Sequence, residues 1–463
     1  MAKSILDLIR ERESEKFDLH ERYLNAQHVR VLKTIGFDRH YVRASGPYLY
    51  DDKGDQYLDL LSGFGVFAVG RNHPTLVAAL REVLEGELSG LVQMDVSVLS
   101  GILAERLLAT APGGLDKVFF ANSGAEAVES AIKFARYHTG RPGLVFCDHG
   151  FHGLSMGALS LNGDEIFREG FGPLLPGNRQ IPFNDLAALE KALAPRDVAA
   201  FFVEPIQGHG VNVPADDYLR EAARLCRAHG TLFVADEIQT GIGRTGRFWA
   251  IEHWGVEPDM LLTAKALSGG FVPVGAVLLR KKVFDSLFSN MVRSPVHGST
   301  FGKNDLAMAA GIATLDVIAA EGLVQNAEKV GEGILSDLRG LIGRYDFVRE
   351  VRGKGLIQAI EFGPSSKLSH KAAYKLLDVA QKGLFSQLVT VPLFQKHRIL
   401  SQTAGHDQPV VKFLPPLVIG DSDRQWIARA VDAVVADTQN VGGAIWELGK
   451  TLASAAIKTK AGM

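Results

Sequence analysis

Short apolar runs alternate with amphipathic stretches between about residues 75 and 330. The runs occur in the segments KVFFANS, GLVFCD, AAFFVEP, TLFVADE, MLLTAK and VGAVLL. Between them lie helical patterns such as DDYLREAARLCRAHG, with Asp216 or Asp217 at its start and Gly230 beyond its end. Nearly continuous apolar strands separated by helices favour an α/β fold, with a mostly parallel sheet covered by helices on both faces.

The flanking segments follow other patterns. Residues 1–74 hold a charged helical lead-in and the segment YLYDDKGDQYLDL, in which residues 52–54 (DKG) predict a hairpin turn between two short strands. Residues 331–463 read as helix, strands within FVREVRGKGLIQAIEF, a further helix, the segment KFLPPLVI and a helical tail. We therefore expect a large domain over residues 75–330. A smaller α+β domain would comprise residues 331–463 together with the N-terminal segment.

Composition limits the function classes. A chain of 463 residues with 50 basic and 52 acidic side chains, a net charge of −2 and no block of like charge gives no support for nucleic-acid binding. Two cysteines, Cys147 and Cys226, exclude a disulfide framework and favour a reducing interior. The N-terminus lacks an apolar signal segment, and no run approaches about 18 apolar residues. We expect a cytoplasmic protein without a membrane span.

Polar residues follow several of the apolar runs. Ser123 and Gly124, Glu204, Asp236 and Lys265 each come directly after one. In parallel sheets, ligands bind beyond the carboxyl ends of the strands. These residues are therefore the candidate site.

The segment NSGAEAVESAIKFARYH predicts an anion site. Ser123 can cap a helix whose apolar residues recur at helical spacing, and Gly124 and Ala125 leave its first turn uncluttered. Free N–H groups at such a helix start suit a phosphate, although many capped helices bind nothing.

Two further segments carry charge at strand ends. In VADEIQTGIGRTGRF, Asp236 and Glu237 close an apolar strand; each needs a partner, either a protonated ring nitrogen or an ordinary ion pair with Arg244. In MLLTAKALSGG, Lys265 either snorkels to solvent or is used chemically. A phosphate cradle, a strand-end acid and a strand-end lysine together are what pyridoxal 5′-phosphate (PLP) requires.

At this point the sequence resembles the class III (subgroup II) aminotransferases of the ornithine, acetylornithine, 4-aminobutyrate and putrescine type. The motifs SGAEA, FHG, VEPIQG, DEIQTGIGRTG, TAKALSGG, HGSTFG, RGKG and PPL stand in family order between about Gly46 and Val435. The stretch LSGFGVFAVGRNHP, with Phe64 as a candidate substrate contact, is closest to putrescine-type enzymes. The resemblance implies PLP fold type I with a seven-stranded, mostly parallel sheet.

The resemblance also implies roles for single residues. Ser123, Gly124 and Ala125 would bind the PLP phosphate, Phe151 would stack on the ring, and His152 would orient the site. Asp236 would pair with the ring nitrogen, Gln239 would contact the ring hydroxyl, and Lys265 would form the Schiff base and carry the proton. Thr300 would complete the neighbouring subunit's phosphate site, which implies a homodimer that could pair into a tetramer. Glu204 and Arg352 match motif residues near the active site.

The sequence departs from the family at two positions. Ornithine-type relatives carry a glutamate in EPIQGEGG and an arginine three residues before PPL. In those relatives the arginine binds the α-carboxylate of the substrate. Here these positions hold His209 and Lys412. Because lysine lacks the bidentate fork of arginine, we hypothesise an amine substrate without an α-carboxylate and a monodentate grip of Lys412 on the co-substrate acid. Neutral drift is the alternative.

Other departures leave alternatives open. The apolar stretch LFSQLVTVPLFQKHRILSQTAGHDQPV would either line a greasy substrate entrance or form an edge strand and loop of the small domain. The first option would suit a bulky apolar aldehyde, such as the side chain of a hopanoid lipid. Lys303 and Asp305 stand where relatives often have Gly and Pro. Dialkylglycine decarboxylase or aminomutase chemistry would use the same scaffold.

Readings from other classes are weaker. GIGRTG superficially suggests the glycine-rich loop of a nucleotide-binding oxidoreductase, but it follows DEIQT rather than passing from strand to helix. A non-catalytic paralogue conflicts with the presence of Lys265. His149 and His152 lie three apart without further metal-ligand spacing, so we expect no metal.

Overall fold

A seven-stranded sheet forms the centre of the large domain. The computed structural model describes residues 3–90 and 94–460. The strand order is β4-β10-β9-β8-β7-β5-β6, and every neighbouring pair is parallel except those that β10 forms with β4 and β9. This confirms the predicted mostly parallel sheet. Its strands are β4 (Lys117–Ala121), β5 (Gly143–Cys147), β6 (Asn178–Ile181), β7 (Val198–Val203), β8 (Leu232–Asp236), β9 (Met260–Thr263) and β10 (Gly275–Leu279).

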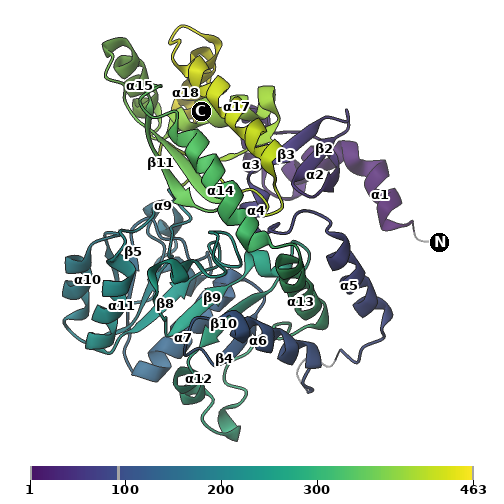
Figure 1. The fold of residues 1–463 in the computed structure, drawn as a ribbon, viewed down its shortest axis with the longest axis vertical. Helices are drawn as coiled ribbons and strands as arrows, with labels where there is room; N and C mark the ends of the chain where they lie inside the picture. Colours follow the sequence, from purple (N-terminus) through teal and green to yellow (C-terminus); the bar gives the residue numbers. More distant parts are fainter. Residues whose placement is uncertain (1–2, 91–93, 461–463) are drawn as a thin grey trace.

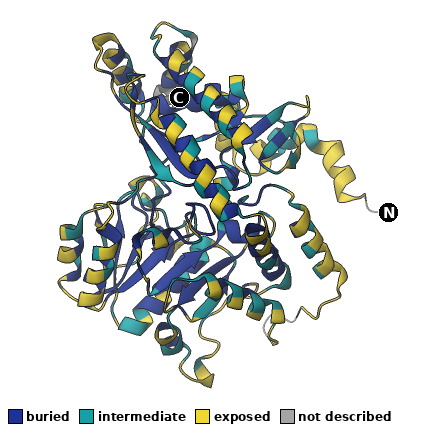
Figure 2. Cartoon of the chain, viewed as in Figure 1, coloured by how far each residue is buried: buried dark blue, intermediate teal, exposed yellow. Residues whose placement is uncertain are grey.

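Helices cover both faces of this sheet (Figure 1). Alternate side chains of one strand enter different cores: Phe202 packs in a cluster with α7, whereas Phe201 packs in the larger cluster with α11 and α13. Burial on both sides explains why the strands are continuous apolar runs (Figure 2). The helices are α5 (Pro74–Glu85), α6 (Val98–Thr110), α7 (Gly124–Thr139), α8 (Met156–Leu159), α9 (Glu165–Arg168), α10 (Leu186–Leu193), α11 (Tyr218–His229), α12 (Lys281–Leu287) and α13 (Asp305–Ala320).

The N-terminal segment joins the C-terminal part of the chain. Strands β2 (Tyr48–Asp51) and β3 (Gln56–Asp59) form the predicted hairpin around residues 52–54. Its outer neighbour is β1 (Tyr41–Ser45), and on the other side β3 pairs with β13 (Ile399–Leu400). The lead-in is helical as expected: α1 (Ile5–Arg12), α2 (Lys16–Tyr23) and α3 (Ala26–Ile35).

A second, four-stranded sheet forms the small domain. Its order is β11-β12-β15-β14, with antiparallel pairing throughout. The strands are β11 (Val348–Lys354), β12 (Ile357–Phe362), β14 (Gln402–Thr403) and β15 (Val410–Phe413). Helix α14 (Leu323–Arg339) leads into it, and α15 (Leu368–Ala380), α17 (Asp421–Thr438) and α18 (Ala444–Lys460) complete it. The predicted α+β character is confirmed, and the tail docks as α18 against α15 and against α16 (Gln387–His397).

The apolar stretch at residues 384–410 matches the expectation of an edge strand only in part. Its longest element is helix α16 (Gln387–His397), which continues through Pro392. The apolar side chains of this helix, such as Leu388 and Phe394, are fully buried in the small domain. The short strands β13 and β14 that follow each lie at the edge of a sheet. Burial on all sides outweighs the low helix propensity of a residue such as Pro392. The stretch therefore does not line an apolar substrate entrance.

Two global expectations concern cysteines and membranes. Cys147 and Cys226 are both free and buried, which confirms that they form no disulfide. Among residues 3–90 and 94–460, no single helix has the length and hydropathy of a membrane span. Only α13 and α14 taken together, bent by 61°, meet that criterion.

Candidate active site

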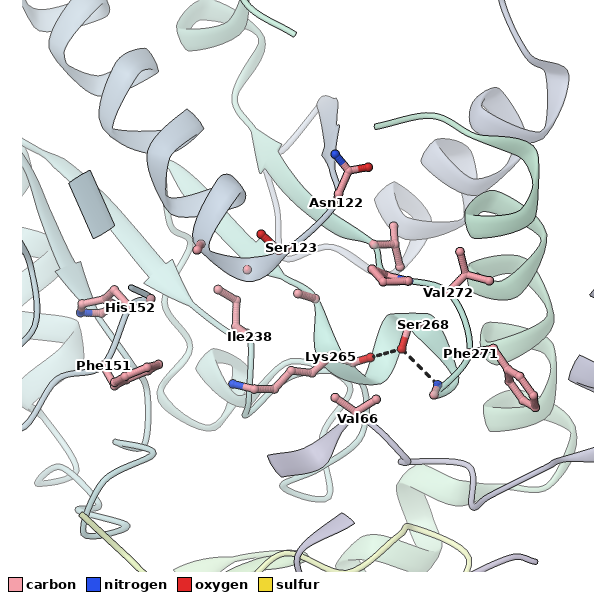
Figure 3. Close-up of a pocket in the computed structure, with 17 residues that line it drawn as sticks. Val66, Asn122, Ser123, Phe151, His152, Ile238, Lys265, Ser268, Phe271 and Val272 are labelled. Carbon is pink, nitrogen blue, oxygen red and sulfur yellow. Dashed lines mark hydrogen bonds between the residues drawn. The ribbon is translucent and has the colours of Figure 1, made fainter. Parts of the chain in front are cut away.

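A cavity of about 380 Å³ lies at the carboxyl-terminal edge of the large sheet. Six predicted site residues line it, contributed by the ends of three different strands and the loops that follow them (Figure 3). They are Ser123, Gly124, Ala125, Phe151, His152 and Lys265. The parallel sheet therefore brings together residues that are up to 142 positions apart in the chain.

Helix α7 begins at the cavity wall. Ser123 is its N-cap, and the Ser123 hydroxyl accepts a 3.1 Å hydrogen bond from the backbone N–H of Glu126. Gly124 and Ala125 line the cavity, and the amides of a first helical turn have no acceptor within the helix. A Cβ at position 124 would lie 2.9 Å from Cδ1 of Ile238, so any side chain there would displace Ile238. The helix start can hold a phosphate dianion.

Asp236 is buried beside His152. Its Oδ2 lies 2.7 Å from Nδ1 of His152, and its Oδ1 accepts a hydrogen bond from the backbone N–H of Ile238. Burial opposes a charge on the imidazole, but the hydrogen bond to Asp236 and the negative charges of Asp236 and Glu204 together outweigh it, so the pKa of His152 is raised. The carboxylate keeps free lone pairs, which a protonated ring nitrogen can use.

Lys265 projects into the same cavity. It begins a short 3-10 turn with a φ of 37°, and the Ser268 hydroxyl donates a hydrogen bond to its carbonyl (Figure 3). Its amine points toward the side of the cavity formed by Phe151 and His152. Burial lowers the pKa of Lys265, and the nearby carboxylates of Asp236 and Glu204 only partly oppose this. The side chain does not snorkel, so its position favours chemical use.

Glu204 holds the loops around the cavity. Its two carboxylate oxygens accept backbone hydrogen bonds from Phe151, at 2.9 Å, and from Gly208, at 2.8 Å. Burial raises the pKa of this carboxyl. Glu204 therefore fixes the backbone that carries the Phe151 ring.

Gln239, Lys412 and Phe64 form one hydrogen-bonded chain. The Lys412 ammonium donates to Oε1 of Gln239 at 2.9 Å and to the carbonyl of Gly208 at 2.8 Å. Nε2 of Gln239 donates to the carbonyl of Phe64 at 3.0 Å. Lys412 is 3% exposed, and burial lowers its pKa to about 7. The structure thus gives Lys412 two specific acceptors.

The other eight predicted site residues do not line the cavity; Asp236, Glu204, Gln239, Lys412 and Phe64 make the contacts described above, and three more lie elsewhere. His209 faces Asp164, with its Nδ1 3.1 Å from the carboxylate, and its ring lies 5.1 Å from that of Phe151. Arg352 donates to the carbonyls of Gly210 and Val211 and to Glu361. Thr300 is exposed on this chain's surface. Their predicted roles stay predictions.

Sequence reasoning missed several residues of the site. Ile238 lines the cavity two positions after Asp236, and its place in the same motif was a usable signal. The carboxylate of Asp164 lies between the Nδ1 atoms of His149, at 2.8 Å, and His209, at 3.1 Å. Burial raises the pKa of Asp164, but its interactions with the two imidazoles outweigh burial, so the pKa is lowered. Nothing local in the sequence marks Asp164, because the pairing joins three separate loops.

Two alternative interpretations of the glycine-rich segment are wrong. Arg244 is buried and donates to the carbonyls of Leu356 and Pro415 rather than pairing with a strand-end acid. Burial without a counter-ion lowers its pKa to about 9. The GIGRTG loop therefore packs between the domains and does not form a nucleotide-binding strand-to-helix turn.

Comparisons with known proteins agree with this site. The family described as aminotransferase class-III matches residues 33–435. Aminotransferase PigE of Serratia sp. is 34% identical over 441 residues, covering 88% of this chain and 52% of that protein, so the chain spans about half of its length. Putrescine aminotransferase of Pectobacterium atrosepticum is 39% identical over 388 residues, covering 81% and 78% of the two chains.

The fold comparison leads to the same class. Ornithine aminotransferase of Toxoplasma gondii, whose crystal structure has PLP at partial occupancy in the active site, has a TM-score of 0.82 and 32% identity, covering 95% of this chain and 99% of that chain. The cavity, the matching family and this shared fold define a PLP-dependent transferase of amino groups. The chain belongs to the class-III aminotransferases.

Proposed function

We propose that this enzyme transfers an amino group between a terminal amine or its aldehyde and a keto acid, with glutamate and 2-oxoglutarate as the acid pair. The observation that carries the proposal is the side chain of Lys265 in one cavity with the Ser123 helix start and with His152, which pairs with Asp236. The putrescine aminotransferase among the relatives supports a terminal amine as the donor.

The residues present fit PLP. When bound, PLP supplies an aldehyde that condenses with amines and a ring that accepts electron density. The amides of Gly124 and Ala125 would hold its phosphate, and Phe151 and Ile238 would enclose its ring. Asp236, oriented by His152, would keep a proton on the ring nitrogen.

Lys265 would carry out the proton transfers of the reaction. Because burial lowers the pKa of its amine, a larger neutral fraction is present near pH 7 than for an exposed lysine. A neutral amine can attack a carbonyl carbon, and it can take a proton from a substrate carbon and return it. The apolar lining at Val66, Ile238 and Val272 excludes water from this exchange.

A homodimer in the cytoplasm completes the proposal. Thr300 is exposed, and three apolar side chains of the same segment, Met291, Val292 and Phe301, are highly exposed as well. Large apolar side chains exposed in one segment favour burial against a partner subunit. The free, buried Cys147 and Cys226 support a reducing compartment. Native mass measurement of the purified enzyme tests the dimer.

The test of the function starts from the cofactor. Purified protein should be yellow, and borohydride should bleach it and attach the cofactor mass to the peptide that contains Lys265. The K265A variant should show neither this attachment nor turnover above about one hundredth of the wild-type rate. Equal transamination by K265A would overturn the proposal.

A donor screen then tests the substrate class. Diamines and plain terminal amines, paired with 2-oxoglutarate, should react faster than ornithine or acetylornithine. Fast turnover of the two amino acids with poor use of plain amines would contradict the terminal-amine assignment.

A further inference from the structure

The segment Ser62–Gly65, labelled α4 in Figure 1, has an unusual backbone. Four consecutive residues have positive φ: Ser62 at 53°, Gly63 at 59°, Phe64 at 60° and Gly65 at 96°. For the two residues with side chains this conformation costs on the order of 1–3 kcal/mol each. Such a turn persists only where its surroundings hold it.

The turn leads directly into the cavity. Val66, the next residue, lines the cavity below Lys265 (Figure 3). Phe64 itself is 54% exposed, so packing of its ring contributes little to holding the turn. The geometry of residues 62–65 therefore positions one wall of the cavity.

Backbone hydrogen bonds hold the turn internally, such as that from the N–H of Phe64 to the carbonyl of Leu61 at 2.9 Å, and two side chains bind it from outside. At its start, Oδ1 of Asp59 accepts from the backbone N–H groups of Leu61, at 2.9 Å, and Ser62, at 2.8 Å. At its end, the carbonyl of Phe64 accepts from Nε2 of Gln239 at 3.0 Å. The Gln239 bond is the one that comes from the loop after β8.

The orientation of the Gln239 amide follows from its partners. A carbonyl can only accept, so Phe64 must face the NH₂ group, and an ammonium can only donate, so Lys412 must face Oε1. Lys412 thereby selects one of two amide orientations. Its second bond, to the carbonyl of Gly208, fixes the ammonium itself.

The approach of these groups depends on Gly208. A Cβ at this position would lie 2.9 Å from Oε1 of Gln239 and 3.1 Å from Oε2 of Glu204. Any side chain would displace the amide from Lys412. Close packing therefore joins three segments: the loop that contains Gly208, the strand β15 with Lys412, and the loop after β8 with Gln239.

We propose that Lys412 is a positioning residue that, through Gln239, holds the left-handed turn at residues 62–65 and so shapes the entrance for the amine substrate. This rests on the proposed function and differs from a direct grip on a carboxylate. Lys412 comes from the small domain, Gln239 from the large domain and Phe64 from the N-terminal segment, so the chain of bonds also ties these three parts together.

The electrostatic surroundings agree with this role. Burial, with smaller contributions from the cations Lys265 and Arg244, lowers the pKa of Lys412 to about 7, while Glu204 opposes this shift. The cation is therefore held mainly by its acceptors at Gly208 and Gln239. An ammonium committed to two protein acceptors is suited to fix structure.

The test uses holoenzyme and the variant K412M. Hydrogen–deuterium exchange of the peptide covering residues 60–67 should accelerate about tenfold, because the Phe64 carbonyl loses its oriented donor. The KM for amine donors should rise about tenfold with kcat changed less than about threefold. K412R, which keeps a cation, should restore both values in part. K396M, at an exposed lysine of α16, is the matched control.

A double-mutant cycle checks the route through Gln239. K412M and Q239A together should raise the amine KM no more than the larger single effect, since both break the same chain. Unchanged exchange at residues 60–67, or a rise confined to the KM of the keto acid, would overturn the proposal and identify Lys412 as a carboxylate grip. Hydrogen–deuterium exchange does not depend on which amine is the substrate. A failed donor screen would therefore contradict the proposed function without contradicting the positioning role of Lys412.

Discussion

Glu237 provides a sharp test, because it follows Asp236 directly and yet has a different environment. It is 1% exposed and accepts hydrogen bonds from the Thr240 hydroxyl and from the backbone N–H of Ile251, at 2.7 Å. Burial, the largest cause, raises the pKa of Glu237 from 4.5 to about 7, and the hydrogen bonds to its carboxylate only partly oppose this. We predict that E237Q stabilises the fold at alkaline pH.

The sign follows from proton linkage. Below pH 4.5 the carboxyl is neutral in the folded and the unfolded chain, and its burial costs no charge. Between pH 4.5 and about 7 only the unfolded chain loses the proton, so stability falls as pH rises. Above the folded pKa the loss is complete and amounts to about 3 kcal/mol, since each pKa unit corresponds to about 1.4 kcal/mol.

The assay is urea unfolding followed by tryptophan fluorescence at pH 5 and pH 8.5. The stability of E237Q relative to wild type should increase by about 2–3 kcal/mol between these two pH values. E105Q, at an exposed position of α6, should show no such increase. D236N should instead lose activity, because it removes the charge beside His152. Parallel pH profiles for E237Q and wild type would refute the reasoning.

Two further predictions concern the cavity and the domain contact. G124A should weaken PLP binding about five- to a hundredfold, because the new Cβ would lie 2.9 Å from a side-chain carbon across the cavity. G101A, where a Cβ meets nothing within 4 Å, should bind PLP as wild type does, and equal affinity of both variants would contradict the argument. R352K should accelerate hydrogen–deuterium exchange at residues 207–213 several-fold, since lysine cannot keep the forked bonds to the carbonyls of residues 210–211. R349K, at an exposed position of the same strand, should leave this exchange unchanged.

Local patterns were sufficient for the framework and for the centre of the site. Continuous apolar runs identified six of the seven strands of the large sheet, because burial on both faces leaves no polar alternation. The strand β6 escaped notice, since only Ile181 of its four residues is buried. The alignment of parallel strands brings Ser123 and Lys265 to one cavity, where His152 pairs with Asp236.

The sequence by itself determined the fold class and the chemistry, because both depend on periodicity and on residue types at strand ends. Only the tertiary structure decided the partners of the buried charges. Asp236 meets His152, Glu237 meets the hydroxyl of Thr240 and the N–H of Ile251, and Lys412 meets Gln239 and the carbonyl of Gly208. The physical reason is that these partners come from loops far apart in the chain. Their distances are set by the packing of two domains and leave no trace in local sequence pattern.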